Sequence, residues 1–285
     1  MTTDIPRPLQ VVLSGVMVLG LTGCASAVES SAPASAAAVT ATAPAARPTV
    51  LVTPTASVGI APTHAPIPRN PAAMDAAVPY QPIIDPTAFS DVIDNPFLPL
   101  TPGTSFAYEG AGEQIKVEVT SERRVVMGVT TVVVKDRVFE DGKLKEDTVD
   151  WYAQDRAGNV WYFGEATTSY EKDPAGDHTG SWEAGVDGAL PGVVMLGDPE
   201  GGDVYRQEFL AGQAEDIALV RHANGAIKVR AGSFERLLVT EEWTPLTPDQ
   251  IELKYYARGV GLVAERLIFG GDDLVELVTW TPAGP

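Results

Sequence analysis

The sequence predicts an all-β domain, mainly antiparallel, built as a single strongly curved sheet or a partly open barrel with a long ordered loop and few short helices. Three observations support this prediction. Apolar and polar residues alternate along successive segments from about residue 88 onward. Glycine-containing turn pairs separate these segments. No segment of this region sustains the apolar period of a helix. About ten to twelve strands are therefore expected, and closing them into a barrel would remove exposed edges.

The first expected strands are separated by rigid loops and tight turns. Prolines within residues 95–103 forbid a helix before the first strand. Asp141-Gly142 marks a hairpin turn, and Gly158-Asn159 marks a further turn. In the strand between them, the face that carries Trp151 is expected to point to the core. The strands expected in this half cover residues 104–108, 114–120, 130–139, 144–153 and 160–163.

The second half begins with a segment of different character. Residues 172–202 are rich in glycine and show few alternations, so they are the predicted long ordered loop. Asn224-Gly225 is the strongest hairpin signal in the chain. Short helices are expected near residues 86–92 and 247–250. The strands expected after the loop cover residues 204–210, 217–222, 226–229, 234–243, 251–257, 261–268 and 274–280.

The N-terminus carries a bacterial secretory signal. Arg7 precedes an apolar segment, residues 11–21, that is shorter than the roughly 20 residues needed to cross a bilayer. The segment ends in Leu21-Thr22-Gly23-Cys24. This ending resembles the lipobox of bacterial lipoproteins, which implies cleavage after Gly23 and attachment of a diacylglycerol lipid to Cys24. The alternatives are an ordinary signal peptide with an incidental cysteine and a short membrane anchor.

These features divide the chain into three parts. Residues 1–23 are the predicted lipoprotein signal peptide. Residues 24–87 comprise the lipidated cysteine and an Ala-, Pro- and Thr-rich segment. Such a composition buries too little apolar surface to offset its ordering entropy, so the segment is predicted to be a disordered tether. Residues 88–285 are the predicted β domain. The expected location is the cell membrane, on its extracytoplasmic side, held by the lipid on Cys24.

The chain is strongly acidic, with a formal net charge of −18 at pH 7. This charge argues against nucleic acid as a partner and against an anionic lipid surface, because both repel it. A basic protein is the partner that the charge favours. Cys24 is the only cysteine. Once it carries a lipid, no disulfide is available, and the domain must be held together by its apolar core.

Several stretches of the domain are similar to known groups of proteins. Residues 150–155 (DWYAQD), 158–165 (GNVWYFGE) and 181–189 (SWEAGVDGA) resemble a group of uncharacterised secreted bacterial proteins, many from actinobacteria. That resemblance implies no particular activity. Residues 254–263 (KYYARGVGLV) are similar to a sequence motif in exported curved-sheet proteins akin to the LolA/LolB lipoprotein carriers. The similarity implies a strand-turn-strand fold, and lipid carriage only by analogy.

Catalytic motifs are largely missing from the sequence. It contains no Gly-x-Ser-x-Gly, no His-Glu-x-x-His and no phosphate-binding glycine loop. Glu165, Glu183 and Asp187 offer an enzymatic alternative, because they lie in or beside the aromatic-rich residues 161–182, and paired acids near tryptophans are typical of glycoside hydrolases. A solvated acidic surface is the simpler interpretation, so no catalytic residue is assigned.

A calcium site is the cofactor hypothesis that the sequence offers. Asp198, Glu200 and Asp203 place three carboxylates on a glycine-containing turn, and calcium prefers such oxygen ligands. Their spacing is not that of an EF-hand. A solvated turn between strands is the alternative.

Trp182, with Glu183 and Asp187 beside it, is the candidate ligand-binding group. Trp182 lies in the predicted loop, where it either plugs the end of the sheet or lines a pocket. We expect the plug, because the apolar residues 193–195 would be hard to keep ordered without it.

The sequence therefore predicts an extracytoplasmic, lipid-anchored lipoprotein that acts in binding or envelope maintenance and is not an enzyme. Its ligand would be apolar or amphipathic. A protein-interaction or structural module with an acidic surface is the first alternative, and a carboxylate-based glycoside hydrolase is the second. An apolar cavity of several hundred Å³ would favour the binder, and a packed interior with an exposed apolar patch would favour the interaction module.

Overall fold

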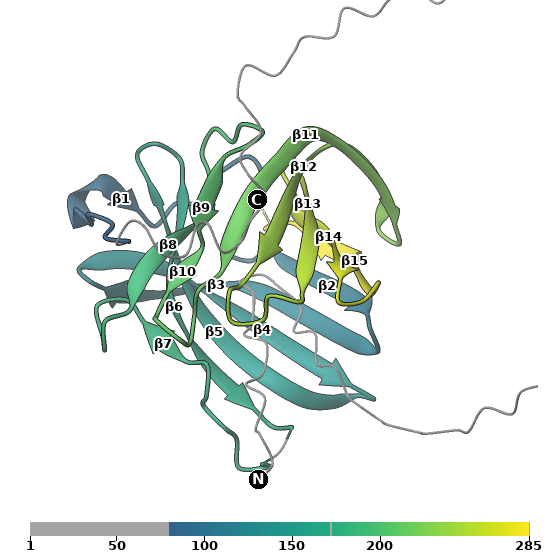
Figure 1. The fold of residues 1–285 in the computed structure, drawn as a ribbon, viewed down its shortest axis with the longest axis horizontal. Coiled ribbons are helices and arrows are strands. Elements are labelled where there is room, and N and C mark those ends of the chain that lie inside the picture. Colours follow the sequence, from purple (N-terminus) through teal and green to yellow (C-terminus); the bar gives the residue numbers. More distant parts are fainter. Residues whose placement is uncertain (1–79, 172, 285) are drawn as a thin grey trace, which may run out of the picture. The chain divides into compact units, whose positions relative to one another are not determined.

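The predicted all-β architecture is confirmed. The structure is a computed structural model that describes residues 80–171 and 173–284, and its fifteen strands form one antiparallel sheet (Figure 1). The single helical element of the described residues is the 3-10 turn η2 (Pro86–Ala88). No helix in this part of the chain is long and apolar enough to span a membrane. The strands are β1 (Phe89–Ser90), β2 (Ser105–Gly110), β3 (Glu113–Val126), β4 (Val129–Glu140), β5 (Lys143–Asp155), β6 (Val160–Ser169), β7 (Trp182–Glu183), β8 (Leu190–Met195), β9 (Val204–Arg206), β10 (Glu208–Phe209), β11 (Ile217–Val229), β12 (Gly232–Trp243), β13 (Ile251–Ala257), β14 (Gly261–Phe269) and β15 (Leu274–Thr281).

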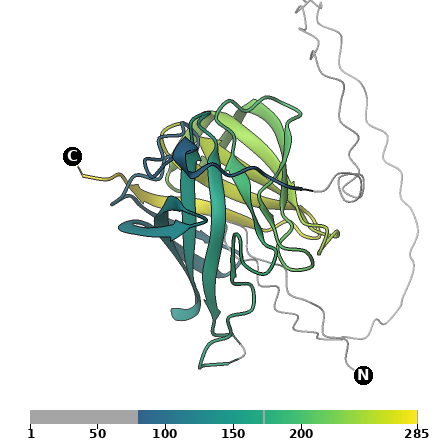
Figure 2. The same ribbon diagram turned by 90° about the vertical axis from the view of Figure 1, so that its left-hand side faces the viewer.

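The strand order makes the sheet a nearly closed barrel. The order is β10-β8-β6-β5-β4-β3-β2-β15-β14-β13-β12-β11-β9, and β1 and β7 add short pairings to β5 and β6. Figures 1 and 2 show the teal strands β3 to β6 on one side and the green and yellow strands β11 to β15 on the other. The two groups form opposite walls, so the inner faces of these strands enclose one interior.

One short segment closes this barrel. β9 and β10, the two ends of the strand order, are separated only by Gln207. β9 pairs with β11, whereas β10 pairs with β8 on the other side of the seam. Gln207 supports the crossing, because its backbone N–H donates to Asp216 O at 2.8 Å and its side chain donates to Glu242 Oε2 at 3.0 Å. The seam is thus closed by a few paired strand residues and by the two hydrogen bonds of Gln207.

The turn chemistry explains two of the connections. Asp141 and Gly142 have φ values of 50° and 73°, which a two-residue hairpin turn of the primed type requires. This hairpin joins β4 to β5, as predicted. Gly158 has a φ of 87° in the turn between β5 and β6, where the sequence also predicted a turn.

Three local predictions are wrong. Asn224-Gly225 lies inside β11, where the register shifts on both sides of Gly225, and the hairpin instead turns after Val229. The glycine serves a β-bulge, since a side chain there would meet Val239. The predicted loop 172–202 contains β7 and β8, and β8 belongs to the barrel wall. Residues 247–250 form turns and no helix.

The described chain begins with residues that contact the sheet. Tyr80 Oη donates to Pro191 O at 2.8 Å, and the Tyr80 ring packs edge-on against Phe209. The N–H of Arg156 donates to Ala88 O at 3.1 Å. The predicted signal peptide, Cys24 and residues 25–79 of the predicted tether lie outside the described residues.

Candidate functional site

The barrel interior is lined by an unusual number of acidic side chains. Register pairing fixes which residues share the inner face: Asp136 lies opposite Val117 and Thr148, and Glu265 lies opposite Lys254 and Val275. Lys254 is completely buried. The carboxyl side chains in the described chain that are no more than 8% exposed are those of Glu113, Asp136, Asp150, Glu165, Glu208, Asp216, Glu242 and Glu265.

Electrostatic effects between the two walls show that these groups face one interior. Burial raises the pKa of Tyr108 on β2, and the charges of Asp136 and Glu265 raise it further. These two acids come from β4 and β14, which are not neighbours in the sheet. Burial likewise raises the pKa of Tyr152 on β5, and Tyr256 on β13 contributes to the shift. The acids and tyrosines therefore form one connected polar interior.

Tyr162 joins two of the carboxyl groups. Its Oη lies 2.8 Å from Asp150 Oδ1 and 3.0 Å from Glu165 Oε2, and all three side chains are buried. A hydroxyl carries one hydrogen, so it donates to one carboxylate only. The second contact is a hydrogen bond only if that carboxyl is protonated and donates to Tyr162. The geometry therefore favours a shared proton in this trio.

The acid–base properties of the trio agree with this proton count. Burial raises the pKa of Asp150 to about 7, and the Tyr162 hydrogen bond offsets part of that shift. Burial raises the pKa of Glu165 well above its usual range, and the charge of Asp150 adds to the effect. The raised pKa values of both carboxyls therefore favour a proton held within the trio at neutral pH.

Lys254 is the fully buried cation of the described interior. Its Nζ lies 3.0 Å from Glu242 Oε2 and 3.7 Å from Glu265 Oε2. Burial alone would lower the pKa of Lys254, but Glu242, Glu265 and Glu252 together raise it above its usual value. Lys254 therefore stays charged and stabilises part of the acidic cluster.

The pKa values of other inner acids are raised despite any nearby cation. Burial raises the pKa of Asp136 well above its usual range, and Asp150 and Glu146 raise it further. Burial raises the pKa of Glu146 to about 8. It also raises the pKa of Asp216 to about 8, although the charge of Lys254 opposes the shift. These groups bind protons more tightly in the folded chain than they would in water.

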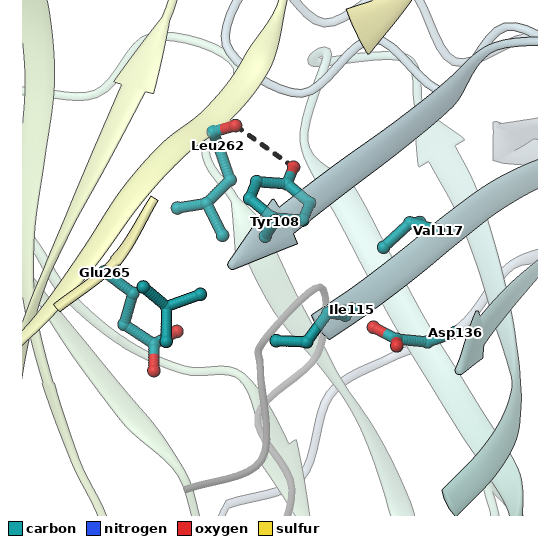
Figure 3. A pocket seen from close by; sticks show the side chains of 7 residues that line it. Tyr108, Ile115, Val117, Asp136, Leu262 and Glu265 are labelled. Atoms are coloured by element: carbon teal, nitrogen blue, oxygen red, sulfur yellow. Dashed lines mark hydrogen bonds between the residues drawn. The ribbon is translucent and has the colours of Figure 1, made fainter. Parts of the chain in front are cut away.

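A small pocket opens between the two walls (Figure 3). It has space for about one water molecule. Asp136 Oδ1 is buried there without a hydrogen-bond partner. Neither oxygen of Glu265 accepts a hydrogen bond from a donor group. Its carboxyl lies against that of Glu252, and this contact raises the pKa of Glu265 and lowers that of Glu252, so Glu265 is the carboxyl that donates when it holds a proton. The pocket is lined by Tyr108, Ile115, Val117, Asp136, Leu262, Glu265 and Val275.

The structure separates the three acids that suggested a hydrolase. Glu165 lies opposite Trp182 in the β6–β7 pairing, so both side chains share the inner face. Glu183 is the next residue and points to the other face, where it forms an ion pair with Arg124 at 2.6 Å. Asp187 is exposed in a turn with a φ of 51°. Glu165 and Glu183 therefore do not face each other across a cleft.

Trp182 is packed in the core. It is 4% exposed, and its ring meets Tyr162 edge-on with centroids 5.1 Å apart. This placement is the one expected of a plug. It also brings Trp182 beside the Tyr162 trio, so the residue supports the acidic interior from the β7 side.

The residues predicted to bind calcium lie on a turn before β9. The N–H of Glu200 donates to Asp203 Oδ2 at 2.8 Å, which closes the turn, and Asp198 is exposed nearby in the chain. Within residues 80–171 and 173–284, no three His, Cys, Asp or Glu side chains are arranged to hold a metal ion. The calcium hypothesis gains no support from this geometry.

Sequence reasoning missed most of the acidic interior. In β5 it assigned the core to the face of Trp151, but the inner face carries Thr148, Asp150 and Tyr152. Trp151 is buried on the opposite face, beneath the guanidinium of Arg124 at 4.1 Å. The sequence did hold a sign of this inner acid, because Asp136 lies on the same face of β4 as the apolar residues Val134 and Val138.

Comparison with known proteins gives no family for this chain. No family model and no curated protein matches the sequence. A solved structure from Bacteroides fragilis, provisionally described as an exported protein with a YmcC-like fold, has 13% identity and a TM-score of 0.39 over 65% of this chain and 99% of that one. A second, from Parabacteroides distasonis and provisionally described as a lipoprotein, has 11% identity and a TM-score of 0.36 over 65% and 98%.

Proposed function

We propose that the chain is a lipid-anchored lipoprotein of the extracytoplasmic envelope, and that its barrel binds a small amphipathic ligand without transforming it. The resemblance of Leu21-Thr22-Gly23-Cys24 to a lipobox supports the anchoring through Cys24. The observation that carries the binding function is the acidic interior with its incompletely paired oxygens. A core that serves stability alone gains little from buried charges, because their desolvation costs as much as their pairing returns.

Ligand entry requires an opening, and the seam is the part of the barrel that is easiest to separate. Five residue pairs hold β9 and β10 to their neighbours, whereas β3 and β4 pair along most of their lengths. Glu208 in this segment and Asp216 beyond it are buried. Separation of the seam would therefore expose the acidic interior to a ligand.

The test is to purify the full lipidated chain from bacterial membranes in mild detergent and to identify bound small molecules by native mass spectrometry. We expect a defined additional mass that is lost in Trp182→Ala, which opens the interior, and kept in Trp280→Ala on the outside. Absence of any bound mass, together with no binding of an amphipathic fluorescent probe, would contradict the binding function.

A second candidate function is a protein-interaction module. A Cβ at Gly185 would lie 3.0 Å from Met127 Cγ, so the tip of the β3–β4 hairpin, with the exposed Val125 and Met127, approaches the turn that carries the exposed Val186. Exposed apolar clusters of this kind are typical of protein interfaces. Photo-crosslinking from position 125 to one envelope protein, and not from position 268 at another exposed apolar residue, would support this function over ligand binding.

A further inference from the structure

We propose that the pocket between Asp136 and Glu265 recognises the primary ammonium group of a ligand. This inference rests on the proposed binding function and names the chemical class of the ligand's polar end. The pocket lies between β2, β3 and β4 on one side and β14 and β15 on the other, as Figure 3 shows. Nothing in the sequence pointed to this position.

The first argument is charge. Eight carboxyl groups in the described interior are at most 8% exposed, and Lys254 is the one basic side chain among the described residues that is equally buried. The charge of Lys254 is already directed at Glu242 and Glu265. An anionic ligand gains nothing from these carboxyls in either protonation state, whereas a cation stabilises their ionised form in a medium of low dielectric constant.

The second argument is hydrogen bonding. Asp136 is 8% exposed and its Oδ1 has no hydrogen-bond partner. The Tyr108 hydroxyl cannot donate to it, because that hydroxyl donates to Leu262 O at 3.1 Å (Figure 3). A buried acceptor of this kind needs an external donor. An ammonium group supplies three donors and a positive charge, so it satisfies Asp136 Oδ1 and favours the ionised form of that carboxyl.

The third argument is size. The pocket has space for about one water molecule, which fits an ammonium group and excludes the larger guanidinium and trimethylammonium groups. The remaining wall is apolar, formed by Ile115, Val117, Leu262 and Val275. This wall suits the carbon atoms next to the nitrogen of a primary alkylamine.

The test uses the full lipidated chain in nonionic micelles with three water-soluble probes of equal chain length: n-butylammonium, n-butyltrimethylammonium and n-butanol. At about 10 mM and constant ionic strength, we expect a saturable rise in the thermal midpoint with n-butylammonium alone. Asp136→Asn keeps the shape but cannot ionise, and it should lower the affinity for n-butylammonium at least about tenfold. Glu265→Gln is expected to act in the same direction.

Asp147→Asn is the matched control. It makes the same substitution at the neighbour of Thr148, the residue that pairs with Asp136 across the strands. Asp147, however, faces outward, where it lies 3.6 Å from Arg137. Its affinity for n-butylammonium should match that of the wild-type chain, and circular dichroism checks that every variant is folded. Equal binding of all three probes, or unchanged affinity in folded Asp136→Asn, overturns the ammonium assignment and leaves the proposed binding function standing. Failure of all three probes also overturns the assignment, whereas the binding function is decided separately by native mass spectrometry.

Discussion

Tyr162 and Trp182 show how single residues hold the acidic interior together. Tyr162 places its hydroxyl between two carboxyl groups, and Trp182 covers the Tyr162 ring edge-on. Aromatic contacts of this kind add to the free energy gained from burial. The trio therefore depends on an apolar side chain that the sequence placed in a loop.

The contribution of Trp182 can be measured by truncation. Because Trp182 is 4% exposed, Trp182→Ala should lower the free energy of unfolding by about 3–5 kcal/mol in urea titrations. Trp280 is 38% exposed, so Trp280→Ala is the control and should lower it by less than about 1 kcal/mol. Equal losses in the two variants would show that Trp182 is not a core residue.

Lys254 allows a second test at the same scale. Lys254→Met leaves Glu242 and Glu265 without their cation, so it should lower the free energy of unfolding by about 3–5 kcal/mol at pH 8. The loss should be smaller at pH 5, because burial raises the pKa of Glu265 and this carboxyl then holds a proton. Lys135→Met removes an exposed cation paired with Glu122 and should cost about 0–1 kcal/mol at either pH. The same loss at both pH values in Lys254→Met would argue against charged partners.

At the scale of the element, the sequence predicted strands well where the side-chain alternation is local. β3, β4 and β5 contain the predicted segments, and the Asp141-Gly142 turn between β4 and β5 is where it was expected. β8 was missed because its glycine- and proline-containing sequence, Leu190 to Met195, becomes a strand only through pairing with β6 and β10. The hairpin predicted at Asn224-Gly225 was wrong because a β-bulge and a hairpin turn both favour glycine.

The candidate site was harder to predict than the strands. The sequence singled out Glu165 and Trp182, but not the partners that bring them together. Asp136, Glu208 and Lys254 were not singled out, since alternation alone does not tell which face of a strand is buried. Only closure of the sheet makes both walls face one interior, and that closure depends on the non-local crossing at Gln207.

The seam can be tested by adding a single methyl group. A Cβ at Gly192 would lie 2.2 Å from the carbonyl carbon of Gln207, so Gly192→Ala must displace the closing segment. We expect a loss of several kcal/mol in stability, of the size seen for severe overpacking, and faster amide exchange in residues 204–209. Gly201→Ala is the control, because its Cβ would find its nearest neighbour at 3.4 Å. Identical exchange in both variants would mean that the seam does not depend on this contact.

At the scale of the whole molecule, the proposed lipoprotein combines a membrane anchor, a tether and a barrel. The barrel has its own core, drawn from strands in both walls. Tyr80 is the first described residue and already contacts the sheet, so the chain before it is the part that could serve as a tether.

Deletion of residues 25–79 tests this division of the chain. The deletion should leave the thermal midpoint of the domain unchanged within about 1 °C, because it removes none of the described contacts. A longer deletion through residue 88 removes Tyr80 and η2 and should lower the midpoint by several degrees. A similar drop in the shorter deletion would show that residues 25–79 pack against the domain.

The most direct test of the acidic barrel interior is the stability of the full chain as a function of pH. The pKa of Asp150 is raised to about 7 and those of Glu146 and Asp216 to about 8, whereas unfolded carboxyls titrate near about pH 4. Between these values the folded chain binds more protons than the unfolded chain, so stability falls as the pH rises. Denaturant unfolding should therefore give a free energy at pH 8.5 that is lower than at pH 5 by at least about 2 kcal/mol. A free energy that is equal at the two pH values, or higher at pH 8.5, would contradict the buried acidic interior.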